Sequence, residues 1–290
     1  EMCIRDRYEN VSILSEKIAN EIKVENGEDI SGYKFIDLDE EHKQELYRNI
    51  NNNLIGHQNF KRKLIENLKN YLILNKLNKK KIFSTFLLGN PGLGKTEIGK
   101  IISKTLNKNS KMIKINFGNY TSQDSINSLI GSPAGYVGCQ GGELSKKIIN
   151  NNVGLIICDE FEKADSEIKN FFLELLDDGK FTDSMGREHD LNGYIIIFTS
   201  NLKSENEFDK FMSPEFKSRI DLICKFLPLN MKEKQEYINF QMEIFKNDVE
   251  KENLKFNKFP KNLAVRFDDT DDLREIKSRV FNELIKYIEK

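Results

Sequence analysis

Apolar and polar positions follow two alternating patterns through the middle of the chain. Short apolar runs of strand length occur at 82–88, 112–115, 153–158, 194–199 and 221–226. Segments with apolar residues at helical spacing lie between them, at 95–107, 141–150 and 166–177. Strands that alternate with helices form parallel sheets covered on both faces. The pattern therefore predicts an α/β fold with a parallel sheet flanked by helices.

The two ends of the chain differ from this middle part. Residues 8–40 are polar with one amphipathic helical repeat, and a further helix is predicted at 61–77. After Pro228 the strand pattern stops, and 231–252 and 271–289 have helical spacing. We therefore predict an N-terminal extension at 1–40, a large α/β subdomain at 41–228 and a small α-helical subdomain at 229–290. Residues 1–7 resemble translated adapter sequence and are excluded from the fold prediction.

Composition narrows the function classes. The chain has 290 residues, 38% of them hydrophobic, and a formal net charge of −1, which disfavours nucleic acid as the partner. No apolar stretch is long enough to cross a bilayer, and no signal peptide opens the sequence. The four cysteines and three histidines are widely spaced, so they predict no zinc cluster, and they fit a reducing cytoplasm.

A phosphate-binding loop follows the first predicted strand. The motif G-x-x-x-x-G-K-[ST] is matched by Gly89, Asn90, Pro91, Gly92, Leu93, Gly94, Lys95 and Thr96. It lies between a strand and a helix, where backbone amides and the helix N-terminus can bind phosphate oxygens. We expect Lys95 to contact the β- and γ-phosphates of ATP and Thr96 to bind Mg²⁺. The alternative is a chance match in a glycine-rich turn.

A second acidic motif ends the strand predicted at 153–158. Asp159 and Glu160 come directly after this apolar run. Strand ends in an open α/β sheet face the ligand crevice. We expect Asp159 to hold Mg²⁺ through water and Glu160 to activate the water that attacks ATP. The alternative is a strand that runs into a solvated acidic turn.

From about residue 54 onward the chain resembles the Clp family of AAA+ ATPases, and especially their second ATPase module. Ile55 and Gly56, with His57 and Gln58, resemble the family's segment that packs on adenine. Residues 131–142 resemble its substrate-gripping pore loop, which would consist of Gly135, Tyr136, Val137 and Gly138. Residues 176–183 lead into Met185, Gly186 and Arg187, which resemble a second pore loop. An ordinary turn with a packed aromatic ring is the alternative for Tyr136.

The resemblance also implies three polar residues at the nucleotide. Asn201 would sense the γ-phosphate, although it could also cap a turn. Arg219, in the segment 214–221, would be an arginine finger supplied to a neighbouring subunit, although it could also form a surface ion pair. Arg274 would be the second sensor, but the Gly and Pro that usually flank it in the family are absent.

The resemblance implies an ATP-dependent protein unfoldase that assembles into a hexameric homo-oligomeric ring and threads polypeptide through its pore. Two alternatives remain open: a nucleic-acid motor or loader with the same fold, and a scaffold that does not hydrolyse ATP. No Ile-Gly-Phe or Ile-Gly-Leu tripeptide lies between Asn201 and Arg219, so we expect no docking to a Clp peptidase. One ATPase module is visible, as in a short single-ring protein or a fragment of a two-ring protein.

Overall fold

A parallel five-stranded sheet forms the centre of the protein. The computed structural model describes residues 33–108, 112–120, 125–132, 141–151, 153–260, 262–263, 265–268 and 270–288. The strand order is β2-β3-β6-β1-β7, and neighbouring strands pair in parallel. The strands are β1 (Phe83–Leu88), β2 (Ile113–Asn116), β3 (Leu155–Asp159), β6 (Ile195–Thr199) and β7 (Leu222–Lys225). This arrangement confirms the predicted α/β fold.

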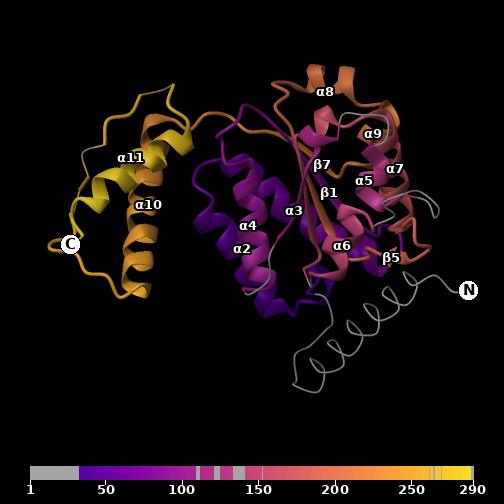
Figure 1. Ribbon diagram of the computed structural model, residues 1–290, viewed down its shortest axis with the longest axis horizontal. Coiled ribbons are helices and arrows are strands. Elements are labelled where there is room, and N and C mark those ends of the chain that lie inside the picture. Colours follow the sequence, from indigo (N-terminus) through magenta and orange to yellow (C-terminus); the bar gives the residue numbers. More distant parts are fainter. Residues whose placement is uncertain are drawn as a thin grey trace, which may run out of the picture.

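Helices cover both faces of the sheet (Figure 1). One layer consists of α2 (Glu40–Asn53), α3 (Gln58–Lys76) and α4 (Lys95–Leu106). The other consists of α5 (Ser125–Ile130), α6 (Glu143–Ile149), α7 (Ser166–Asp178), α8 (Glu205–Phe211) and α9 (Pro214–Arg219). Successive strand residues belong to opposite layers: Ile156 and Ile196 pack under α5–α9, whereas Ile157 and Ile197 pack under α2–α4. This alternation explains why the central strands β3 and β6 are apolar up to their last residue.

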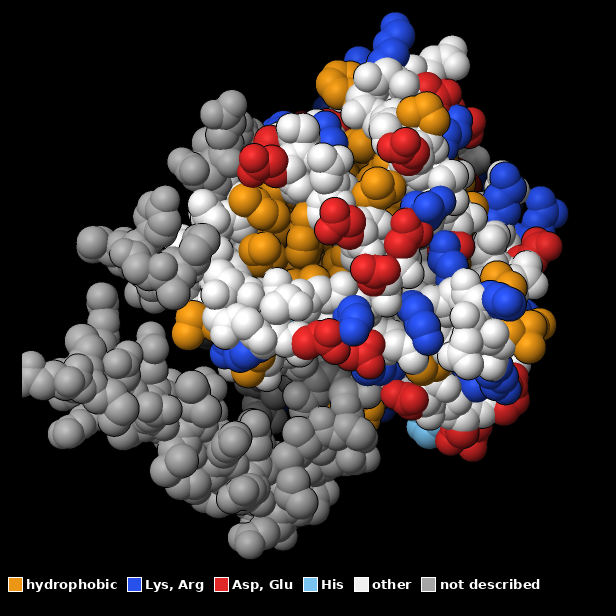
Figure 2. Space-filling view, turned by 90° about the vertical axis from the view of Figure 1, so that its right-hand side faces the viewer, with side chains coloured by type: hydrophobic (Ala, Val, Ile, Leu, Met, Phe, Trp, Pro, Cys, Tyr) orange, Lys and Arg blue, Asp and Glu red, His pale blue; other side chains and the backbone are white. Residues whose placement is uncertain are grey.

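The layer of α5–α9 also brings hydrophobic side chains to the surface. Figure 2 shows them in a hollow near the centre of this face, bordered by acidic side chains. Within this layer, Ile126 and Ile130 of α5 and Phe171 and Leu173 of α7 are partly buried against the core. Contiguous apolar surface of this kind is typical of interaction sites.

The C-terminal helices α10 (Met231–Lys251) and α11 (Leu273–Ile285) pack on each other and lie on the side of α2 and α4 (Figure 1). They enclose a hydrophobic cluster of their own, which includes Ile238, Ile276 and Val280. Asn230 begins α10 with a capping box, in which its side chain and that of Glu233 each bond the other residue's backbone. No helix in the described ranges is both long and apolar enough to cross a membrane.

Several elements were not predicted from the sequence. They include α2, which Asp39 caps by accepting a hydrogen bond from the backbone N of His42 at 2.8 Å. They also include the antiparallel pair β4 (Lys180–Thr182) and β5 (Glu188–Asp190). The amphipathic helix predicted within residues 8–40 falls almost entirely on residues 1–32, which lie outside the described residues.

Candidate functional site

The loop between β1 and α4 needs glycine at its first position. Gly89 has φ +132°, and a Cβ there would lie 2.6 Å from the carbonyl oxygen of Phe226. An L-residue would therefore be strained and would collide with the backbone after β7. Gly94 precedes α4 with φ +90°, so the loop turns sharply into the helix N-terminus. The result is the geometry expected of a phosphate-binding loop.

Lys95 is the buried cation of this loop. The residue is only 8% exposed. Its Nζ donates hydrogen bonds to the carbonyl oxygens of Gly89 and Asn90, the latter at 2.7 Å. Burial lowers the pKa of Lys95 to about 8, and Asp159 and Glu162 oppose this shift by favouring the charged form. A desolvated ammonium whose hydrogen bonds go to neutral carbonyl oxygens is suited to an anionic ligand.

Both oxygens of the Asp159 carboxylate are engaged. Lys114 in β2 places Nζ 2.6 Å from Oδ2, and the Thr199 hydroxyl donates to Oδ1. Burial raises the pKa of Asp159, but the hydrogen bonds from Lys114 and Thr199, together with the positive charges of Lys114 and Lys95, bring the pKa below its ordinary value. The sequence analysis identified neither Lys114 nor Thr199, because their proximity depends on β3 lying between β2 and β6.

Glu160 has an unusual backbone conformation. Its φ of +56° is in the left-handed region, which costs a non-glycine residue about 1–3 kcal/mol and is common at functional sites. Its Oε2 lies 2.8 Å from Nζ of Lys163 and would lie 2.7 Å from a Cβ added to Gly118. The carboxylate therefore turns back toward the end of β2, beside the Asp159 site.

Asn201 follows β6 at the same edge of the sheet. Its backbone N donates to Oε1 of Glu162 at 3.1 Å, which fixes the turn after the strand. Since β6 lies between β1 and β3, the structure brings the predicted residues Lys95, Asp159, Glu160 and Asn201 together at the carboxyl edge. Glu162 was missed by the sequence analysis, although it lies in the same acidic segment.

The predicted adenine segment lies between the sheet and the C-terminal helices. Ile55 packs against the C-terminal cluster, and a Cβ on Gly56 would lie 2.4 Å from Leu229. His57 has Nε2 3.1 Å from the carbonyl oxygen of Leu93, and its ring centroid lies 4.1 Å from that of Phe226. This segment therefore contacts the phosphate-binding loop directly.

The start of α11 touches the phosphate-binding loop from the other side. The backbone N of Leu273 donates to the Gly92 carbonyl oxygen at 3.2 Å, and a Cβ on Gly92 would lie 2.8 Å from Asp272. Arg274 is the next residue, and its charge acts on Lys95, whose pKa it helps to lower. The structure thus places Arg274 at the phosphate-binding loop, near Lys95.

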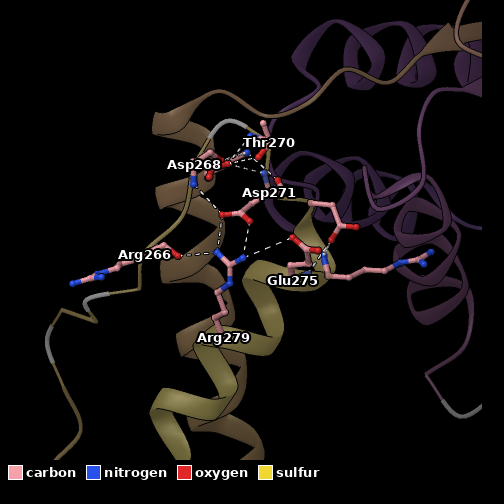
Figure 3. Close-up of polar contacts among 9 residues, drawn as sticks. Arg266, Asp268, Thr270, Asp271, Glu275 and Arg279 are labelled. Atoms are coloured by element: carbon pink, nitrogen blue, oxygen red, sulfur yellow. Dashed lines mark hydrogen bonds and ion pairs between the residues drawn. The ribbon is translucent and has the colours of Figure 1, made fainter.

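A polar network fixes the loop that precedes α11 (Figure 3). Arg279 makes two 2.7 Å hydrogen bonds to the Asp271 carboxylate and also donates to the carbonyl oxygen of Arg266. The hydrogen bonds from Arg279 and from the backbone N of Asp268 lower the pKa of Asp271 to about 2. Lys234, which is 1% exposed, donates to the carbonyl oxygens of Asp268 and Asp271 at 2.6 and 2.9 Å. The loop that presents Arg274 is therefore held on several sides.

Arg219 lies at the opposite edge of the sheet from the phosphate-binding loop. Its carbonyl oxygen is 2.9 Å from Oγ of Ser84, near the start of β1. Ser84 precedes Gly89 by five residues of extended chain, so these positions are roughly 17 Å apart. The Arg219 side chain is 42% exposed and pairs with Asp177 of α7. The structure therefore does not bring Arg219 to the loop of its own chain.

The two predicted pore loops differ in what the structure describes. Gly135, Tyr136, Val137 and Gly138 lie outside the described residues. Met185, Gly186 and Arg187 lie in the turn between β4 and β5. Asp183 organises this turn by accepting hydrogen bonds from the backbone N of Met185 and from Nε of Arg187, both at 2.9 Å.

The residues at the carboxyl edge fit a nucleotide phosphate with Mg²⁺. Lys95 supplies a buried positive charge, and the N-terminus of α4 adds backbone donors. Asp159 is held ionised beside it, and Thr96 is half-buried in the first turn of α4. Because Mg²⁺ is usually bound by one or two carboxylates together with substrate phosphates, Asp159 and Thr96 are a sufficient protein contribution.

Comparisons with known proteins agree with this geometry. The model of a family described as AAA domain (Cdc48 subfamily) matches residues 80–269. The chaperone protein ClpB of Malacoplasma penetrans (strain HF-2) is 35% identical over 280 residues, which cover 90% of this chain and 38% of the chaperone. The ClpB of Clostridium perfringens (strain 13 / Type A) is 35% identical over 194 residues, 59% of this chain and 22% of that protein. The chain thus spans about two fifths or less of these relatives.

Proposed function

Because the chain belongs to the AAA+ ATPases of the Clp family, we propose that it hydrolyses ATP to unfold or remodel other proteins. One observation carries the proposal: Lys95, Asp159, Glu160 and Asn201 meet at the carboxyl edge, beside a glycine-constrained loop and a helix N-terminus. The matching relatives are named chaperones, which favours protein as the substrate over nucleic acid. We place this activity in the cytoplasm.

Each residue at this edge has a role in the proposed reaction. Lys95 binds the β- and γ-phosphates, and Asp159 and Thr96 hold Mg²⁺, which neutralises phosphate charge when bound. Glu160 accepts a proton from the attacking water, and Asn201 orients the γ-phosphate. Ile55 and Gly56 contact the adenine, and Arg274 reaches the phosphates from α11. We propose that residues 41–228 form the large subdomain and residues 229–290 the small one.

We further propose that the chain works as a homo-oligomeric ring, with six subunits as in the Clp resemblance. Two observations support assembly. Arg219 is 42% exposed and lies at the edge of the sheet opposite its own phosphate-binding loop, so it can serve a neighbouring site. The hydrophobic hollow over α5–α9 in Figure 2 offers apolar surface for a contact between subunits.

Replacing Arg219 with alanine is expected to lower ATP turnover by about 10³–10⁵-fold, the range for arginine fingers in other nucleotidases. Nucleotide affinity should change little, because Arg219 is remote from its own loop. Adding Arg219→Ala subunits to parent protein should reduce ATPase activity by more than simple dilution. Full activity that does not depend on protein concentration would contradict the proposed ring.

Replacing Tyr136 with alanine tests the proposed use of ATP energy. We expect the variant to keep basal ATPase activity and assembly but to lose unfolding of a stable tagged protein. The reason is that an aromatic ring on a glycine-flanked loop can grip polypeptide without contacting nucleotide or metal. Unfolding is measured by loss of substrate fluorescence, with ATPase rate measured in the same samples.

The control for Tyr136→Ala is Tyr287→Ala, which removes a 38% exposed tyrosine near the C-terminus. It should behave as the parent in both assays. Unfolding at the parent rate by Tyr136→Ala would rule out the threading role. ATPase stimulation by single-stranded DNA, with none by unfolded polypeptide, would favour the nucleic-acid motor instead.

A further inference from the structure

Asp221 joins the segment that carries Arg219 to the strand that carries the phosphate-binding loop. It lies between α9 and β7. Its Oδ2 accepts a hydrogen bond from the backbone N of Ser84 at 2.8 Å and lies 3.1 Å from the Ser84 hydroxyl. Its Oδ1 lies 2.9 Å from Nζ of Lys80. Both carboxylate oxygens are therefore bound to the start of β1.

The same two partners also hold the main chain of Arg219. Its carbonyl oxygen lies 2.9 Å from Oγ of Ser84 and 3.1 Å from Nζ of Lys80. Ser84 is fully buried, and the side chains of Lys80 and Asp221 are 20% exposed. We call the contacts of Ser84 and Lys80 with Asp221 and the Arg219 carbonyl the clamp. Because the clamp is largely shielded from water, its hydrogen bonds to charged groups contribute more than they would on the surface.

The clamp matters because α9 is short. The helix has six residues and ends at Arg219, so little helical structure fixes the direction of this side chain. The Arg219 guanidinium meets Asp177 of α7, but that pair is more than 40% exposed on both sides. Exposed ion pairs hold geometry weakly. The backbone contacts through Ser84 and Lys80 are the firmer constraint on where Arg219 points.

We propose that Asp221, acting through Ser84 and Lys80, is the positioning residue that aims Arg219 at the nucleotide of a neighbouring subunit. This inference rests on the proposed role of Arg219 in the ring. It adds that β1 connects two sites. The carboxyl end of the strand leads into the chain's own phosphate-binding loop, and its amino end fixes the residue presented to the next subunit.

Asp221→Ala should reduce ATP turnover by about 10²-fold, the loss expected when a catalytic group is displaced by about 1 Å. The Kd for ATP should stay at the parent value, because the variant leaves every contact of the chain's own loop intact. Lys80→Met removes one member of the clamp without disturbing buried Ser84, and it should give a smaller loss of the same kind. It also provides the test if Asp221→Ala does not fold.

The matched control is Asp209→Ala. It breaks a 2.7 Å ion pair with Lys217 on the same helix α9, but this pair does not touch Arg219. Its turnover should equal that of the parent. If Asp209→Ala lost as much ATP turnover as Asp221→Ala, the loss of any contact around α9 would be enough to lower turnover. That result would overturn the specific role of Asp221.

Mixed rings separate a defect in trans from a defect in the subunit's own site. Glu160→Gln subunits have a disabled site but an intact Arg219, so mixing them with Asp221→Ala subunits should restore ATPase activity above the sum of the two. Arg219→Ala mixed with Glu160→Gln should show the same recovery. Asp221→Ala mixed with Arg219→Ala should show none, because both lack a working finger.

The outcomes distinguish the two levels of the proposal. Recovery with Arg219→Ala but not with Asp221→Ala would overturn the positioning role and leave the finger intact. No recovery with Arg219→Ala would overturn the action of Arg219 across the boundary, and the inference about Asp221 with it. A Kd for ATP that rises as much as turnover falls would show that Asp221 supports its own site, which also overturns the proposal.

Discussion

Replacing Lys95 with alanine is expected to weaken ATP binding strongly. The variant removes the buried ammonium that the phosphates would meet and leaves backbone amides alone to bind them. Truncating one partner of a buried charge pair costs about 2–5 kcal/mol, which is a loss of roughly 30-fold or more in affinity. Binding of a fluorescent ATP analogue is the direct measurement.

Lys100→Ala is the matched control for Lys95→Ala. Lys100 lies on the same helix α4, but its side chain is 53% exposed and pairs with Glu97. It should bind nucleotide as the parent does. ATP binding by Lys95→Ala at the parent affinity would mean that the loop is not the phosphate site.

Replacing Glu160 with glutamine is expected to preserve ATP binding and to stop hydrolysis. Glutamine has nearly the same shape but cannot accept the proton of the attacking water. Loss of a general base lowers rates by about 10²–10⁴-fold. The exposed contact with Lys163 contributes little to the fold, so the protein should remain intact. ATPase turnover and analogue binding, measured together, give the result.

Glu167→Gln, in the first turn of α7, controls for the loss of one negative charge nearby. It is exposed and should hydrolyse ATP normally. Hydrolysis by Glu160→Gln at the parent rate would remove Glu160 from the role of base. If Glu160→Gln lost both ATP binding and hydrolysis, Glu160, with its left-handed backbone conformation, would have a structural role instead.

The sheet could be predicted because its strands are buried on both faces. All residues of β6 are buried and all but the last are apolar, so a continuous apolar run marked this strand without help from periodicity. Helix α2 was missed because its sequence is largely polar, and only Leu46, Tyr47 and Ile50 are buried. Its stability comes from packing against α4, which a local pattern does not contain.

The chemistry of the site was predictable where one segment carries it. The phosphate-binding loop and the Asp159–Glu160 pair are contiguous in sequence and follow strands. The pairs Lys114–Asp159 and Asp177–Arg219 each join distant segments. Lys114 and Asp159 meet because β2 lies beside β3 in the sheet, and Asp177 and Arg219 meet because α7 packs against α9. Sequence order alone does not specify which strands are neighbours.

The Lys114–Asp159 contact has a consequence for how the protein exists without nucleotide. Asp159 already has a tethered counter-ion, 2.6 Å away, on the adjacent strand. The carboxylate is thus charge-compensated within the fold by a side chain of the same subdomain. If Asp159 holds Mg²⁺ as proposed above, Mg²⁺ that arrives with a nucleotide has to compete with an ammonium group at high effective concentration. Lys114 would thus lower the affinity of Asp159 for free Mg²⁺, so that the metal would bind mainly as a complex with nucleotide phosphate.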